Sequence, residues 1–188
     1  SIGIRLNNTL MYDNYEKVNS FHSLPEIMIG MSKKIMVHGE GFLSNRNKSF
    51  VAEGGSVYLK YRFFSSDEVH SHFRMAFYGR YAFNNSDIHQ QAIDLNGHNS
   101  GYELGYVATK LINKTALSAS YSFVHADDNA NNNVFIYPAE QRDAMAYTLS
   151  IGKLMLPKQY TSYKQVNLNA MVEFLGQTNF STGRTFVD

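Results

Sequence analysis

Apolar and polar side chains alternate with a period of two along most of this chain, which is the pattern of a β-strand with one apolar and one polar face. In the stretch LSASYSF at residues 117–123, serine occupies every second position and an apolar or aromatic residue lies between. The same alternation runs through SVYLKYRFF, HFRMAFYGRYAF, GYELGYVATK, MAYTLSIGK and VNLNAMVEF. Because no helical period interrupts the series, the pattern predicts an all-β fold and argues against a parallel α/β fold.

These runs predict about nine strands in a single domain covering residues 1–188, although the alternation is less regular in the first third. Most runs hold about 9–11 residues, the length with which a tilted strand crosses a membrane. The composition agrees, since Tyr and Phe each occur 13 times and Pro only 3 times. Aromatic residues are enriched in strands, whereas Pro is depleted.

The connections between the expected strands alternate between short and long. Short ones are expected at residues 32–34, 64–68, 112–114 and 157–162, and long polar ones at residues 13–23, 44–52, 84–99 and 127–143. A soluble sandwich has no physical reason to collect its long loops at one end, whereas outer-membrane barrels combine short periplasmic turns with long outer loops. The pattern therefore favours an antiparallel up-and-down transmembrane β-barrel.

Charged residues lie on the polar face of several expected strands, and burying them unpaired in an apolar core would be costly. In a membrane barrel this face would line the lumen. The candidate lumen-lining residues are Lys60, Arg62, Arg74, Arg80, Glu103, Ser118, Ser120, Ser122 and Glu173. A soluble ligand-binding barrel would turn the same charges to water, so alternation alone leaves it open. Tyr and Phe residues near the expected strand ends favour the membrane barrel, which carries aromatic girdles at both interfaces.

Basic residues predominate on the two central expected strands, where Lys60, Arg62, Arg74 and Arg80 lie. In a narrow barrel, these cations and Glu103 would form a network of both signs that fills the lumen. In a wider barrel, they would select solutes by charge and favour anions. The sequence thus leaves both a filled and an open lumen, and it predicts that Arg74 and Arg80 point inward.

Composition argues against several other classes of protein. The net charge is +1 and the Lys and Arg residues are scattered, so no nucleic-acid partner is expected. The chain has no cysteine, hence no disulfide framework and no thiolate metal site. No run approaches the roughly 18 apolar residues of a membrane-spanning helix. The chain begins at Ser1 without a leader, so we expect the signal that directs it to a Gram-negative outer membrane to lie outside this sequence.

A search for catalytic and metal-binding motifs gives weak candidates. His70 and His72 share a strand face, as a two-histidine metal site would require, but a solvated strand end is the simpler interpretation. His38 and Glu40 also share a face, and we interpret them as pore-lining residues rather than as a general-base pair. The run DDNANN at residues 127–132 lacks the glycine and the distal glutamate of a calcium loop. We therefore expect no enzyme activity, no cofactor and no metal.

A family resemblance rests on GGSVYLKYRFF, FRMAFYGRYAF, NSGYELGYVATKLINKTALSASYSFVHA, YTLSIGKLMLP and VNLNAMVEFLGQT in succession. This succession resembles the outer-membrane barrels assigned to the MetA pathway of phenol degradation, a family also described as transporters. The upstream PEIMIGMSKKIMVHGEGFLS is similar to the family's early hairpin, and the resemblance spans residues 24–177. It implies an antiparallel outer-membrane barrel with a role in the passage of small, often apolar molecules, and it carries no catalytic residues.

The chain departs from such barrels in two ways. It has no tryptophan, and its final residues, TGRTFVD, do not end on an aromatic residue. An even-numbered barrel needs more than nine strands, so 10 or 12 are expected in total. The stretch NFSTGRTFVD either begins a further strand or leaves the barrel incomplete at the C-terminus, and we expect the latter.

The expected function is that of an outer-membrane channel or transporter-like barrel for a small-molecule solute, surrounded by outer-membrane lipid. The alternative is a non-conducting structural or interaction barrel. It would present the Asn-rich connections NNSDIHQQAIDLNGHN and DDNANNNVFIYPAEQRD to a protein partner.

Overall fold

The computed structural model describes residues 1–13, 18–45, 50–86, 88, 92–130, 142–157, 166 and 168–187. Within them, ten antiparallel strands form one sheet in chain order, which confirms the predicted all-β, up-and-down arrangement. The strands are β1 (Ile2–Asp13), β2 (Val18–Gly30), β3 (Ile35–Ser44), β4 (Val51–Asp67), β5 (Ser71–Asn84), β6 (Ser100–Ile112), β7 (Thr115–Asp127), β8 (Asp143–Leu156), β9 (Leu168–Asn179) and β10 (Thr185–Val187). None of the described residues forms a helix long and apolar enough to cross a membrane.

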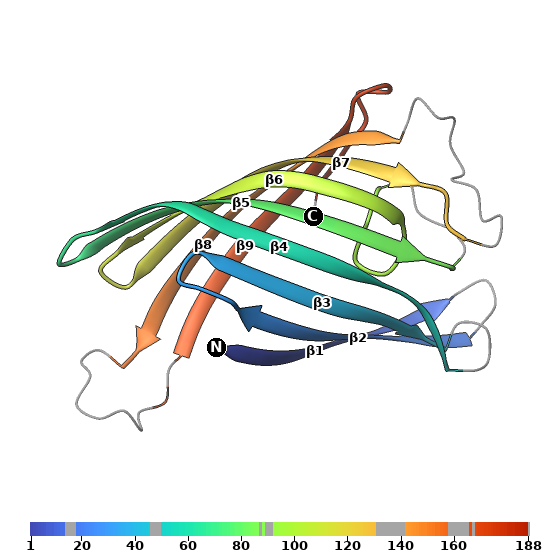
Figure 1. Ribbon diagram of the computed structural model, residues 1–188, viewed down its shortest axis with the longest axis horizontal. Helices are drawn as coiled ribbons and strands as arrows, with labels where there is room; N and C mark the ends of the chain where they lie inside the picture. The colour runs from blue at the N-terminus through green and yellow to red at the C-terminus, as the bar shows by residue number, and fades with distance from the viewer. Residues whose placement is uncertain are drawn as a thin grey trace.

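The sheet curls strongly, so it has a concave and a convex face (Figure 1). Among the described strands it is not closed, because β1 pairs only with β2 and the last strand, β10, pairs only with β9. The β9–β10 pairing is short and joins residues 176–178 to residues 185–187. The observed architecture is therefore an open, curled antiparallel sheet with one free edge along β1 and another along β9 and β10.

The connections differ in part from those expected. The connections from β2 to β3, β4 to β5, β6 to β7 and β8 to β9 start and end at one end of the sheet, and those from β1 to β2, β3 to β4, β5 to β6, β7 to β8 and β9 to β10 start and end at the other. The expected long connection at 13–23 is wrong, because β2 already begins at Val18 and its backbone pairs with the end of β1. Strand pairing uses backbone groups, so a polar stretch can extend a hairpin beyond its apolar part. The connection after Pro157 is longer than expected, since β9 begins only at Leu168.

Cross-strand pairing assigns the strand residues to the two faces. The convex face carries an apolar band, formed by Ile2, Ile4, Ile27, Ile29, Val57, Leu59, Tyr61, Phe77, Tyr81, Leu104, Tyr106, Leu117, Tyr121, Leu149, Ile151, Val172 and Phe174. These side chains are exposed, with 80% of Ile4 and 60% of Leu104 accessible to solvent. The concave face is mostly polar along its middle. This polarity is the reverse of that in a soluble β-protein, where apolar side chains fill the interior.

A β-bulge in β4 changes which residues face inward. Arg62 pairs with Ala76, but Phe64 pairs with Met75, so Phe63 is an extra residue in β4. The convex face consequently receives two successive phenylalanines, since the Phe63 ring stacks on Phe77 at 4.5 Å and the Phe64 ring contacts Phe73 at 5.9 Å. Beyond the bulge, odd-numbered residues of β4 take the concave side, as expected when one residue is inserted into a period of two.

The largest buried cluster fills the concave face near the end with the longest connections. It joins strand residues Phe42, Ala82, Val124, Ala126 and Ala144 to three aliphatic residues of the β5–β6 connection, Ile88, Ile93 and Leu95. All of these side chains are at most 6% exposed. The described part of this connection is therefore packed onto the concave face.

Candidate functional site

The nine residues predicted to line a lumen all lie on the concave face. Residues that pair directly across successive strands form a row across the sheet. Lys60 lies in the same row as Ser122, and Arg62 lies in the same row as Ser120. Arg74 shares its row with Ser118 and, across β8, with Glu173, while Arg80 pairs with Glu103. The bulge in β4 does not alter this, because Lys60 and Arg62 precede it. Whether the face encloses a lumen stays a prediction.

A polar belt crosses six strands in the middle of this face. It consists of Glu26, His38, Tyr58, Tyr78, Arg80, Glu103 and Ser122, from β2 to β7. At its β2 end, Glu26 accepts a hydrogen bond from His38 and lies 3.6 Å from the guanidinium of Arg5. The ring of His38 then contacts Tyr58, with their centroids 4.9 Å apart.

The other end of the polar belt centres on one carboxylate. Glu103 accepts a hydrogen bond from the Tyr78 hydroxyl at 2.9 Å and another from Ser122 Oγ at 2.7 Å. The rings of Tyr78 and Tyr58 lie 5.5 Å apart, and the guanidinium of Arg80 lies 5.6 Å above the Tyr58 ring. Hydrogen bonds and ring contacts thus run across the face from Glu26 to Ser122 and hold the side chains in fixed positions.

Arg80, a member of the predicted charge network, bonds to a residue outside the strands. No ion pair joins Arg80 to Glu103 within the described part of the chain, although the two residues are paired across β5 and β6. Arg80 instead donates a hydrogen bond to Asn96 of the β5–β6 connection. The folding of this connection onto the sheet could not be read from strand alternation, so the sequence offered no sign of the Asn96 contact.

The three predicted serines bond to neighbouring strands. Ser118 Oγ lies 2.5 Å from Thr109 Oγ1, and Ser120 Oγ lies 2.6 Å from Thr148 Oγ1. Together with the Ser122 bond to Glu103, these contacts satisfy the hydroxyl groups across β6, β7 and β8. The small side chains keep this part of the concave face shallow and polar.

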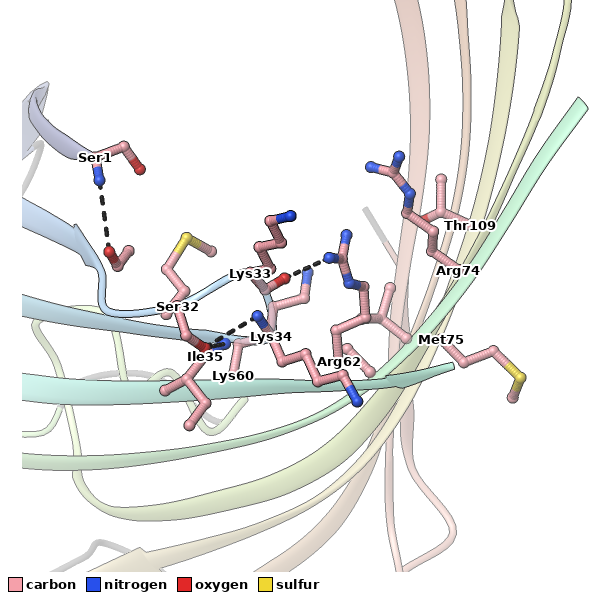
Figure 2. A pocket seen from close by; sticks show the side chains of 14 residues that line it. Ser1, Ser32, Lys33, Lys34, Ile35, Lys60, Arg62, Arg74, Met75 and Thr109 are labelled. Carbon is pink, nitrogen blue, oxygen red and sulfur yellow. Dashed lines mark hydrogen bonds between the residues drawn. The ribbon is translucent and has the colours of Figure 1, made fainter. Parts of the chain in front are cut away.

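A basic cluster of Lys60, Arg62 and Arg74 lies on the concave face toward the end with the shorter turns. It lines a cavity of about 400 Å³ beside the β2–β3 turn (Figure 2). Arg62 donates a hydrogen bond to the backbone carbonyl of Lys33 in that turn. Arg74 lies 3.4 Å from Asp67 at the end of β4, where both side chains are half exposed. Lys60 has no ion-pair partner among the described residues.

Two histidines of the weak candidate sites, His72 and His38, bond to carboxylates. His72 Nδ1 lies 2.7 Å from Asp67, and this hydrogen bond, assisted by Arg74, lowers the pKa of the Asp67 carboxyl. His38 bonds to Glu26 of the adjacent strand rather than pairing with Glu40, whose carboxylate accepts a hydrogen bond from Ser56. In the described ranges, no group of three His, Cys, Asp or Glu residues could hold a metal ion.

The β5–β6 connection is held to the concave face by polar as well as apolar contacts. The Ile93 amide donates to Gln177 Oε1 at 2.7 Å, and Gln177 Nε2 donates to the Ile93 carbonyl at 2.8 Å. Asn129 Nδ2 donates to the backbone carbonyls of Ser86 and His98. Sequence reasoning missed this arrangement. The signal was available in the isolated Ile88, Ile93 and Leu95 of an otherwise polar stretch.

The concave face combines fixed cations, carboxylates, hydroxyls and tyrosines, which suits the reversible binding of polar solutes. No family model, no curated protein and no solved structure matches this chain. The function proposed below is therefore supported by the distribution of side chains over the two faces.

Proposed function

We propose that this protein is an outer-membrane β-barrel that passes small polar solutes along the concave face of its sheet. The observation that carries the proposal is the inverted polarity of the sheet. Apolar side chains form a band across the convex face, whereas the polar belt and the basic cluster occupy the concave face. Outer-membrane barrels have an apolar outer band and a polar interior.

An apolar surface of this extent is unusual for a protein surrounded by water. Monomeric soluble proteins rarely expose contiguous apolar patches of more than a few hundred Å², and larger ones mark contact with a membrane or a partner. Lipid would cover the band, to which β1, β2 and β4 to β9 contribute side chains. The strands from β1 to β9 also have adequate length, since β3, the shortest of them, contains 10 residues.

A membrane location places a condition on the free edges of the sheet. Backbone N–H and C=O groups that lack partners cannot remain in hydrocarbon, and a closed barrel is the only β-structure that avoids them. The proposal therefore requires the edges of β1 and of β9–β10 to be hydrogen-bonded in the membrane, to each other or to further strands. The resemblance to the MetA-pathway barrels stays a prediction, and the proposal is supported by the distribution of side chains instead.

A second candidate function is a non-conducting structural or interaction barrel. It is favoured by the β5–β6 connection, whose residues Ile88, Ile93 and Leu95 are buried against the concave face. In a closed barrel, this segment would narrow the interior at the end with the long connections. A narrowed barrel could still pass small solutes, which is why conduction must be measured.

Two measurements test the proposal in sequence. Protein refolded in detergent should migrate differently on gels with and without heating, as membrane barrels do, and should insert into lipid vesicles. Inserted protein should then give discrete current steps in a planar bilayer. Folding in water without detergent would contradict the membrane location. Insertion without current steps would support the interaction barrel instead.

A further inference from the structure

We infer that the basic cluster is a binding site for a small organic carboxylate. This inference deepens the proposed function, on which it rests for the statement that solutes reach the concave face. Binding itself does not require conduction, so the site can be tested on protein in detergent. None of the described residues that line the cavity beside the β2–β3 turn is acidic. The nearest carboxylate in an ion pair with the cluster is Asp67, which lies 3.4 Å from Arg74 outside the lining.

The cations converge from two neighbouring strands. Lys60 and Arg62 come from β4 and Arg74 comes from β5, and the guanidinium groups of both arginines extend into the same space (Figure 2). No carboxylate of the described residues lies within ion-pair distance of Lys60 or Arg62. The bond from Arg62 to the Lys33 carbonyl fixes the guanidinium and leaves N–H groups for a ligand. Arginine presents these donors in a planar fork that fits a carboxylate.

The remaining lining explains why the ligand should be organic. Met36, Ala76 and Val107 lie in the same rows as the cations and give the cavity an apolar floor. A volume of about 400 Å³ is within the range of ordinary small-molecule sites. A carboxylate head could thus bind the cations while a small apolar body covers the floor. Inorganic phosphate would bind the cations but would leave the apolar floor uncovered.

Benzoate is a suitable probe, and benzamide is its uncharged counterpart of the same shape. We expect calorimetry on the refolded protein in detergent to give binding of benzoate and at least tenfold weaker binding of benzamide. Lys60→Gln and Arg62→Gln should each weaken benzoate binding by about tenfold, as expected for the loss of a charge-assisted contact. Lys110→Gln removes the same charge from the opposite face of β6 and should leave the affinity unchanged.

Three results would overturn the site. They are equal affinity for benzoate and benzamide, unchanged affinity in both cluster variants, and binding of phosphate without binding of benzoate. If a variant fails to fold, the comparison of benzoate with benzamide on the unaltered protein still tests whether the site selects a carboxylate. Benzoate binding by a protein that gives no current steps would contradict the channel and support the site. Current steps from a protein that does not bind benzoate would support the channel and contradict the site.

Discussion

At the scale of single residues, Gly105 leaves room on β6 for the side chains of Tyr78 and Ser122, two members of the polar belt. A Cβ atom at this position would lie 2.6 Å from Ser122 Cβ and 2.8 Å from Tyr78 Cζ. The space above Gly105 is therefore occupied by the two side chains that donate to Glu103. A glycine at this point is required by close approach, since its backbone conformation is an ordinary extended one.

Gly105→Ala should destabilise the protein by about 1–3 kcal/mol, the usual cost of inserting a methyl group into a filled site. Gly39→Ala is the matched control, because a Cβ there would meet nothing within 4 Å. It should be neutral or stabilise the strand by about 0.5 kcal/mol. Urea unfolding in detergent, followed by circular dichroism, measures both variants. Equal stability of the two would contradict the close approach, in which the Tyr121 backbone oxygen takes part together with Ser122 and Tyr78.

Asp67 provides a pH prediction at the turn between β4 and β5, beyond the apolar band. The hydrogen bond from His72 lowers the pKa of its carboxyl, so this bond stabilises the folded turn above the pKa of an unfolded aspartate. The contribution is lost as pH falls through the lower, folded-state pKa. His72→Ala should raise the pKa of Asp67 in a carbon-detected NMR titration. His70→Ala, in the same β4–β5 connection, should leave the pKa of Asp67 unchanged. A wild-type pKa of Asp67 in His72→Ala would refute the contact.

At the scale of elements, the β5–β6 connection depends on one side chain from a distant strand. Gln177 of β9 bonds to both backbone groups of Ile93, so it joins two elements that are far apart in the sheet order. Gln177→Ala should accelerate hydrogen exchange at the Ile93 amide by about tenfold, the effect of losing one hydrogen bond.

Thr178→Ala is the control for this exchange experiment, because Thr178 lies on the opposite face of β9 and bonds to Thr185. Exchange at Ile93 should be unaffected by it. If Gln177→Ala leaves the exchange unchanged as well, the connection is held by its other contacts, which include the buried Ile93 and Leu95 and the bonds from Asn129. A rise in bilayer conductance in Gln177→Ala would further indicate that the connection narrows the interior.

The elements also show which parts of the structure are readable from sequence. Strands β4 to β9 were predicted because alternation distinguishes their two faces, and the same alternation placed the nine candidate residues on one face. The start of β2 was missed because backbone pairing with β1 is independent of side-chain polarity. The pairing of His38 with Glu26 was missed because partners on neighbouring strands depend on register, which a single strand does not reveal.

At the scale of the whole molecule, the two faces should respond oppositely to charge. Leu149 and Ser150 are adjacent in β8, and they face the convex and concave sides respectively. Leu149→Arg should destabilise insertion into lipid vesicles by about 2–4 kcal/mol, as found for cations on the lipid face of barrels. Ser150→Arg should leave insertion nearly unchanged. Gel mobility with and without heating measures the inserted fraction, and equal effects of both variants would contradict a lipid-facing convex side.

The chain-order pairing of the strands has a consequence for how such a protein can change over evolutionary time. Among the described residues, each strand is hydrogen-bonded only to its neighbours in the sequence order of strands. A duplicated or deleted hairpin could therefore enter or leave the sheet without rethreading the chain. The sheet would widen or narrow by one strand pair per event. Events outside β2 to β6 would leave the cavity beside the β2–β3 turn and its cations intact, because those strands supply most of its lining.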